Sequence, residues 1–174
     1  MFLHRDAERW KHIEAAAARA EELRPAVSPQ DRDLLVAAAW LHDIGYSTVL
    51  RETGFHPLDG ASYLHSVGHP RTAALVAHHS GARFVAGSRG LADQLARFPF
   101  TEDALTDALT YADQTVRPTG GRATVPDRLA DTARRHGPDA PTSRVRHLRE
   151  PYVLAAARRT EERLRGGTAT GRRP

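Results

Sequence analysis

The chain contains no cysteine, one lysine and few aromatic residues, which make up 6% of the sequence. The lack of cysteine excludes a disulfide scaffold, a thiolate zinc site, an iron–sulfur cluster and a cysteine nucleophile. Any metal site must therefore use nitrogen and oxygen donors. The longest apolar run, residues 34–41, is far too short to cross a bilayer, and the charged N-terminus lacks the apolar stretch of a signal peptide. We expect a cytoplasmic protein that makes no membrane contact.

Charged residues of both signs are mixed along the whole chain. Its 174 residues include 25 basic and 21 acidic side chains, and Lys11 is the only lysine, so the other basic residues are arginine. Because arginine alternates with Asp and Glu, a nucleic-acid partner is disfavoured.

The length predicts one domain, which we place at residues 1–165. The Gly/Thr/Arg-rich segment 166–174 predicts a disordered basic tail.

Hydrophobic periodicity predicts an all-α fold. Apolar residues recur at helical spacing in segments that begin at Ser, Thr, Asp or Pro and end near Gly or Pro. The predicted helices cover residues 6–24, 34–45, 57–68, 71–81, 102–113, 127–137 and 151–164. No segment alternates with the period of a strand. Trp10 and Trp40 lie within two of these helices, and we expect both to anchor the core.

The histidines are the most informative residues of the sequence. There are ten of them, and two groups stand at the ends of strongly apolar helices: the His42-Asp43 pair and the His78-His79 pair. Polar side chains at such places are costly unless they are paired or bind a metal. Imidazole and carboxylate are the ligands that divalent iron, manganese and similar ions accept. The pattern therefore predicts a metal site between helices.

The order of these residues resembles a known family. His12 is followed by WLHDIG at 40–45, FHPLDGASYL at 55–64, LVAHHSGA at 75–82 and YAD at 111–113. This constellation is similar to the HD superfamily of metal-dependent phosphohydrolases over roughly residues 8–135. The His56 motif followed by the His-His pair is most similar to the HDIG and HD-GYP branch, whose sites hold two metals. The resemblance implies a single-domain HD helical bundle.

The resemblance also implies two sets of ligands for one or two divalent ions, chosen from Mn, Fe, Co, Ni, Zn and Mg. The first ion would take His12, His42, Asp43 and Asp113, and the second would share Asp43 and add His56, His78 and His79. Of the adjacent pair His78 and His79, at least one is expected to be a ligand, while the other is left as a ligand or as a residue that supports the site or faces substrate. Asp59 either complements the N-terminal dipole of its helix or orients His56.

The activity implied by the resemblance is hydrolysis of a phosphate ester by metal-activated water. Asp43 would be central to it as a shared ligand. Arginine is the natural partner of phosphoryl oxygens, and Arg83 and Arg117 are the arginines we expect to bind them. The substrate would be a small phosphorylated compound, and a nucleotide is favoured.

Two departures from the HD-GYP pattern leave alternatives open. HD-GYP phosphodiesterases carry a lysine after HDIG and a GYP signature beyond the His-His pair, whereas this chain has Tyr46 and then GARFVAG. Cleavage of a cyclic dinucleotide is therefore disfavoured. A mixed-valence di-iron oxygenase with a tyrosine near the metals is one alternative, and a non-catalytic module that holds a metal or ligand is another. The sequence leaves the oligomeric state open.

Overall fold

The computed structural model describes the backbone of residues 2–170 and the side chains of residues 7–166. No strand occurs in this part of the chain, where the sole β-type pairing is one bridge between Val116 and Arg122. The all-α prediction is confirmed. The α-helices are α1 (Phe2–Glu22), α2 (Arg32–Leu41), α3 (His56–Ser66), α4 (Pro70–His78), α5 (Ala82–Ser88), α6 (Ala92–Leu95), α7 (Ala104–Gln114), α8 (Val125–His136), α9 (Pro141–Arg144) and α10 (Arg146–Thr170). The 3₁₀ segments are η1 (Arg24–Ala26), η2 (Pro29–Asp31), η3 (Ile44–Tyr46), η4 (Thr48–Leu50) and η5 (His79–Gly81).

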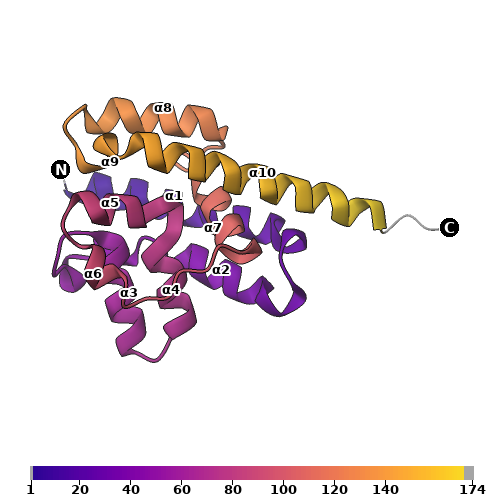
Figure 1. Cartoon of the computed structure of the whole chain (residues 1–174), viewed down its shortest axis with the longest axis horizontal. Coiled ribbons are helices and arrows are strands. Elements are labelled where there is room, and N and C mark those ends of the chain that lie inside the picture. The colour runs from indigo at the N-terminus through magenta and orange to yellow at the C-terminus, as the bar shows by residue number, and fades with distance from the viewer. Residues whose placement is uncertain (1, 171–174) are drawn as a thin grey trace.

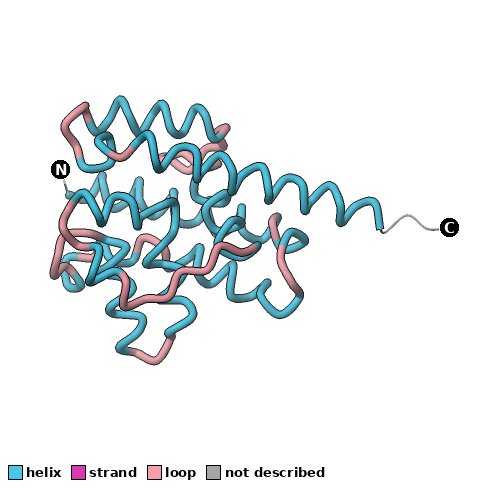
Figure 2. The backbone as a smooth tube through the Cα atoms, viewed as in Figure 1, coloured by secondary structure: helices cyan, strands magenta, loops and turns pink. Residues whose placement is uncertain are grey.

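The helices form a bundle around α1, α2 and α7. These three helices contact one another, and α10 packs along α7. Helices α3 and α4 form a hairpin at one end of the molecule, whereas α8 and α10 cover the opposite side (Figure 1). Short loops connect most of the helices (Figure 2). The C-terminal part of α10 extends beyond the rest of the bundle (Figure 1).

Two clusters of buried apolar side chains make up the core. The larger cluster includes Leu35 of α2, and the smaller one lies among α3, α4 and α5. Leu41 and Ile44, which flank the His42-Asp43 pair, pack against the smaller cluster. His42 and Asp43 therefore lie where the chain leaves the larger cluster and reaches the smaller one.

Gly45 allows η3 and α3 to approach each other closely. A Cβ atom at Gly45 would lie 2.0 Å from the carbonyl oxygen of His56 and 2.5 Å from the backbone nitrogen of Gly60. No side chain fits at these distances, because both neighbours are backbone atoms. The glycine of the HDIG sequence thus brings the start of α3 against the residues that follow Asp43.

Trp10 and Trp40 do not anchor the core, contrary to the sequence prediction. Their side chains are 55% and 42% exposed, and their rings contact each other at a centroid distance of 5.9 Å. Each tryptophan precedes a buried histidine by two residues, and residues two apart on a helix point in nearly opposite directions. Turning His12 and His42 inward therefore turns both tryptophans outward.

Some helix boundaries differ from the prediction. Helix α2 ends at Leu41 and not at Gly45, and α4 ends at His78 and not at Gly81. The second difference has a clear cause, because Ser80 and Gly81 both adopt positive φ angles that a helix cannot continue. The last helix begins five residues before Pro151, since the amide of Arg149 already bonds to the carbonyl of Val145.

Helix α10 is tied to α7 by a buried carboxylate. Asp107 accepts two hydrogen bonds from Arg159, at 2.8 and 2.6 Å, and one from Arg163 at 2.8 Å.

Helix α10 continues through residues 166–170, which differs from the predicted disorder, and residues 171–174 lie outside the described residues. The domain boundary at residue 165 stays a prediction.

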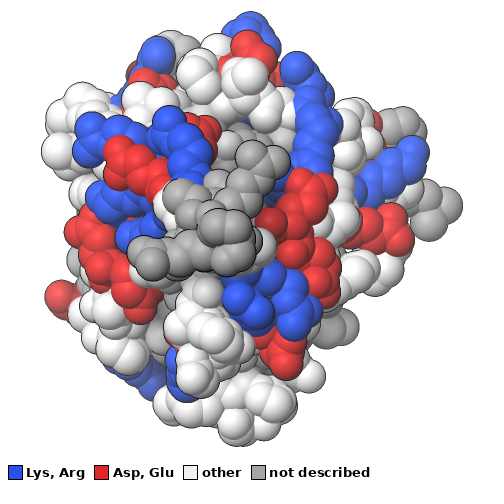
Figure 3. Space-filling model, turned by 90° about the vertical axis from the view of Figure 1, so that its right-hand side faces the viewer, with Lys and Arg blue, Asp and Glu red and all other residues white. Residues whose placement is uncertain are grey.

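Basic and acidic side chains lie next to one another on the face drawn in Figure 3. Some charges of opposite sign also pair within single helices, such as Arg19 with Glu22 and Arg146 with Glu150. None of the described helices combines the length and the apolar character needed to cross a bilayer.

Candidate metal centre

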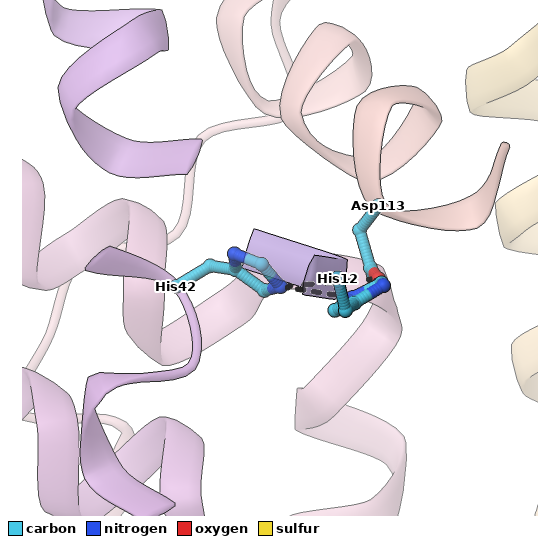
Figure 4. A group of neighbouring side chains, drawn as sticks. All are labelled: His12, His42 and Asp113. Atoms are coloured by element: carbon cyan, nitrogen blue, oxygen red, sulfur yellow. Dashed lines mark hydrogen bonds and ion pairs between the residues drawn. The ribbon is translucent and has the colours of Figure 1, made fainter. Parts of the chain in front are cut away.

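The first group of candidate ligands consists of His12, His42 and Asp113, which come from α1, the end of α2 and α7. Nε2 of His12 lies 3.0 Å from Oδ1 of Asp113 and 3.3 Å from Nε2 of His42. Figure 4 shows the three side chains pointing toward one another. All three are buried. Residues that are far apart in the sequence thus present their donor atoms to one small volume.

Backbone carbonyls determine which nitrogen of each ring carries the proton. Nδ1 of His12 lies 3.2 Å from the carbonyl oxygen of Arg117, and Nδ1 of His42 lies 2.7 Å from that of Ala39. A carbonyl oxygen only accepts, so each Nδ1 must donate. In a neutral ring, the Nε2 atom then has a free lone pair. Both lone pairs face Asp113, which is itself an acceptor, so this arrangement requires a positive charge at its centre.

Ser80 and Gln114 hold the other oxygen of Asp113. The hydroxyl of Ser80 donates to Oδ2, and the amide nitrogen of Gln114 donates to the same oxygen at 2.7 Å. Ser80 is the one described non-glycine residue with a positive φ, at 52°. Strained backbone of this kind persists where surrounding contacts enforce it, often at functional sites. Here it places the hydroxyl so that Oδ1 of Asp113 faces His12.

The second group consists of Asp43, His56 and His79. Nε2 of His56 lies 3.3 Å from Oδ1 of Asp43 and 3.3 Å from Nε2 of His79. Nδ1 of His79 donates to the carbonyl of Val76 at 2.6 Å, which leaves its Nε2 lone pair facing the group. The ring of His56 stacks on that of Tyr46 at a centroid distance of 3.9 Å. This group lies nearer the surface, because the His56 side chain is 21% exposed.

Asp59 positions the backbone just before His56. Its carboxylate accepts hydrogen bonds from the amide and hydroxyl of Thr53, at 2.9 and 2.7 Å, and from the amide of Gly54 at 3.0 Å. No hydrogen bond joins Asp59 to the His56 ring among the described side chains. The sequence left two roles for Asp59, complementing the helix dipole or orienting His56. These contacts favour the second role, which Asp59 performs through the loop that leads into α3.

The charges within the site favour the protonation states that bind metal. Burial by itself raises the pKa of Asp43, but the neighbouring His42, His56 and Arg9 outweigh it and hold that pKa well below its usual range. Burial lowers the pKa of His56 to about 3, against the opposing effect of Asp43. At neutral pH the Asp43 carboxylate is therefore ionised and the His56 imidazole is neutral.

In the first group, His12 and Asp113 each stabilise the charged form of the other. Burial acts to lower the pKa of His12, but the hydrogen bond to Asp113 and its charge outweigh burial and raise that pKa. The pKa of Asp113 is held well below its usual range, because His12 and His42 outweigh the effect of burial. A proton between His12 and Asp113 and a metal ion at the same place satisfy the same electrostatic requirement.

The donor sets fit divalent ions. Within each group the donor atoms all lie within 4.8 Å of one another. Two donors that are each about 2.1 Å from one ion lie about 3.0 Å apart at a right angle and about 3.4 Å apart at a tetrahedral angle. Two distances in the first group, 3.0 Å and 3.3 Å around Nε2 of His12, agree with these values, and the third, between Nε2 of His42 and Oδ1 of Asp113, is wider at 3.9 Å. Imidazole and carboxylate donors suit Mn, Fe, Co, Ni and Zn, and do not select one of them.

Of the seven ligands expected from the sequence, His78 alone points away from both groups. Its Nε2 atom donates to the carbonyl oxygen of Phe98 at 2.8 Å, and its ring contacts that of Phe100. Because α4 ends between His78 and His79, the two neighbouring rings face different surroundings. The structure thus brings His79 to the site and directs His78 toward the segment around Phe98.

The two arginines expected to bind phosphate have other contacts. The guanidinium of Arg83 lies among the rings of Phe84, Phe100 and Tyr152, at 4.0–4.5 Å from their centroids. Nε of Arg117 donates to the carbonyl of Arg122. Arg117 contributes to the site through its backbone, because its carbonyl oxygen accepts the hydrogen bond from His12.

Arg9 is a charged residue beside the second group that the sequence interpretation missed. Its Nη1 atom lies 2.8 Å from Oδ2 of Asp43, and its guanidinium carbon lies 3.3 Å from the centroid of the Tyr46 ring. A signal was present in the sequence, since Arg9 precedes His12 by three residues and so shares its face of the helix. Ser80 was also missed, because no sequence pattern marks a serine with a positive φ.

The family model described as HD domain matches residues 9–115, which include all six residues of the two groups. Neither the curated proteins nor the solved structures include a match to this chain.

Proposed function

Because the chain belongs to the HD domain family, we propose that it is a metal-dependent phosphohydrolase that cleaves a phosphate ester of a small phosphorylated compound. The metal ligands in this proposal are His12, His42, Asp113, Asp43, His56 and His79. HD domains bind divalent metals, and the site offers the chemistry that such ions require.

One observation carries this proposal: two groups of three donors lie side by side, and Asp43 is oriented toward both. Its Oδ1 atom lies 3.3 Å from Nε2 of His56 in its own group and 3.6 Å from Nε2 of His42 in the other. Divalent ions held there would lower the pKa of water and offset the charge of a phosphoryl group. A carboxylate between two such ions is the arrangement that supports hydrolysis of a phosphate ester.

The chain's own residues divide the remaining tasks. The buried first group holds its donors rigidly through backbone carbonyls and the Ser80 hydroxyl. On the more exposed side, Arg9 is the described arginine that forms an ion pair with one of the six ligand residues. We assign recognition of phosphoryl oxygens to Arg9, in place of Arg83 and Arg117, since guanidinium binds them with two parallel hydrogen bonds.

A nucleotide remains the favoured substrate. This preference rests on the resemblance of the sequence to HD phosphohydrolases. The exposed Trp10 and Trp40 pair does not contribute to it, because both rings point away from His12 and His42. The proposal therefore expects nucleoside phosphates to be better substrates than phosphate esters of aliphatic alcohols.

The test begins with metal analysis of the purified protein and a screen of phosphomonoesters and nucleoside phosphates with added manganese. We expect metal-dependent release of phosphate, which a chelator removes and manganese restores. His147→Ala, a change of an exposed histidine on α10, is the matched control and should retain full activity. Absence of phosphate release from every compound in the presence of bound metal would contradict the proposal.

A second candidate is a mixed-valence di-iron oxygenase. The stacking of Tyr46 on His56 favours it, because it places a tyrosine directly beside the second group. Oxygen consumption and a mixed-valence EPR signal from the iron-loaded protein would support this candidate, and a hydrolase should show neither. Bound metal without turnover in either assay would instead indicate a non-catalytic binding module.

A further inference from the structure

Arg9 covers one side of the second group. It lies on α1, one turn before His12, and its side chain is 34% exposed. Its Nη1 atom donates to Oδ2 of Asp43, whose own side chain is only 8% exposed. The planar guanidinium also stacks on the ring of Tyr46. Arg9 is thus a positive charge held in place by two different contacts.

The two oxygens of Asp43 have different partners. Oδ1 faces the imidazole nitrogens of His42 and His56, whereas Oδ2 faces Arg9. Oδ1 is thus the oxygen close to the donors of both groups, while Arg9 offsets the charge of the same carboxylate from Oδ2. An ion in the second group would bind beside a carboxylate that is already paired with a cation.

Asp113 of the first group has no such competitor at its second oxygen. There the partners of Oδ2 are the hydroxyl of Ser80 and the amide of Gln114, which are neutral donors. These donors orient the carboxylate without neutralising it. Arg128 and Arg149 act on Asp113 without forming an ion pair with it, whereas Arg9 contacts the Asp43 carboxylate directly.

We propose that Arg9 is a built-in counter-cation of Asp43 that competes with the second metal ion. The group His12, His42 and Asp113 then fills first, and the group Asp43, His56 and His79 fills with lower affinity, because its one carboxylate is already paired with Arg9. This inference rests on the metal centre of the proposed function. It adds that the two ions bind unequally and that an arginine of this chain causes the inequality.

The test is a titration of metal-free protein with Mn²⁺, in which EPR measures the free ion. The wild type should show one strong and one weak site. Arg9→Gln removes the charge and should strengthen the weak site by about tenfold while leaving the strong site unchanged. Arg9→Lys keeps the charge, so its weak site should stay close to that of the wild type. Melting curves of both variants verify that they are folded.

Arg71→Gln is the matched control. It removes the same charge from an exposed ion pair with Asp31, where the Arg71 side chain is 70% exposed. Its two sites should match those of the wild type. An unchanged weak site in Arg9→Gln, or an equal change of both sites, would overturn the inference and leave the proposed function intact. Failure of the wild type to bind Mn²⁺ at all would overturn both.

Discussion

The two groups of candidate ligands use the same donor types in different surroundings. The first group is closed: its rings donate to backbone carbonyls, and the Asp113 carboxylate is held by Ser80 and Gln114. The second group lies nearer the surface, where His56 stacks on Tyr46 and Asp43 pairs with Arg9. Donor chemistry alone therefore does not decide the role of a site. Rigid neutral contacts suit the holding of an ion, and exposed charged contacts suit exchange and recognition.

The groups also differ in the backbone that supports them. His12 and Asp113 lie on the regular helices α1 and α7. His56 is positioned by the close approach at Gly45, and His79 follows the end of α4. We therefore expect the second group to respond more strongly to changes in backbone packing, while the first responds to the loss of hydrogen bonds.

The largest effect should come from Asp43→Ala, because this carboxylate lies between the groups. We expect the metal content of the purified variant to fall to background and its phosphatase activity to fall by at least about 100-fold. Elemental analysis and phosphate release measure the two quantities. His147→Ala serves again as the control, and retained activity in Asp43→Ala would count heavily against the proposed site.

Gly45→Ala should separate the two groups. Its methyl group would overlap backbone atoms of His56 and Gly60, so η3 and α3 must move apart at a cost of about 3 kcal/mol in the free energy of unfolding. The second group should lose its ion while the first keeps it, which denaturant unfolding and metal stoichiometry can check. Gly87→Ala is the control, since a Cβ atom at Gly87 would meet nothing within 4 Å, and it should leave both quantities close to those of the wild type.

Ser80→Ala should weaken the first group selectively. Loss of the hydroxyl frees Oδ2 of Asp113, and loss of such a supporting contact typically lowers metal affinity by about 10- to 100-fold. The strong site should change in a Mn²⁺ titration, and the weak one should not. Ser80→Gly should lose the same affinity but be more stable than Ser80→Ala by about 1 kcal/mol, because glycine adopts a positive φ without strain. Equal stability of the two variants would argue against that strain.

The last prediction concerns the pH dependence of the metal-free protein. Unfolded His56 binds a proton near its usual pKa, whereas the folded residue has its pKa lowered to about 3. Between these values the unfolded state binds more protons, so stability should fall with falling pH, by at most about 1.4 kcal/mol per pH unit for one proton. His12→Gln tests the opposite sign, since the raised pKa of His12 stabilises the folded state at low pH.

Melting curves between pH 7 and pH 4 measure this dependence. His56→Gln should show a flatter decline than the wild type, and His12→Gln a steeper one. The same slope of stability against pH in both variants would contradict the opposite pKa shifts of His56 and His12.

Much of the fold and part of the site followed from the sequence. Helical periodicity and turn residues placed the helices, and the histidine and aspartate motifs contained all six residues that the structure brings together. The sequence interpretation chose Arg83 and Arg117 because they follow the motifs along the chain. The structure instead places Arg9 on Asp43, because α1 packs on α2.

The sequence by itself determined which donors a metal centre in this protein could use: without cysteine, these are mainly imidazole and carboxylate groups on helices. Only the tertiary structure decided which of them face inward. Within one helix, spacing sets the angle between side chains, but the direction toward another helix depends on packing and on where each helix ends. The left-handed Ser80 separates the surroundings of His78 and His79, and the inward turn of His12 and His42 exposes Trp10 and Trp40.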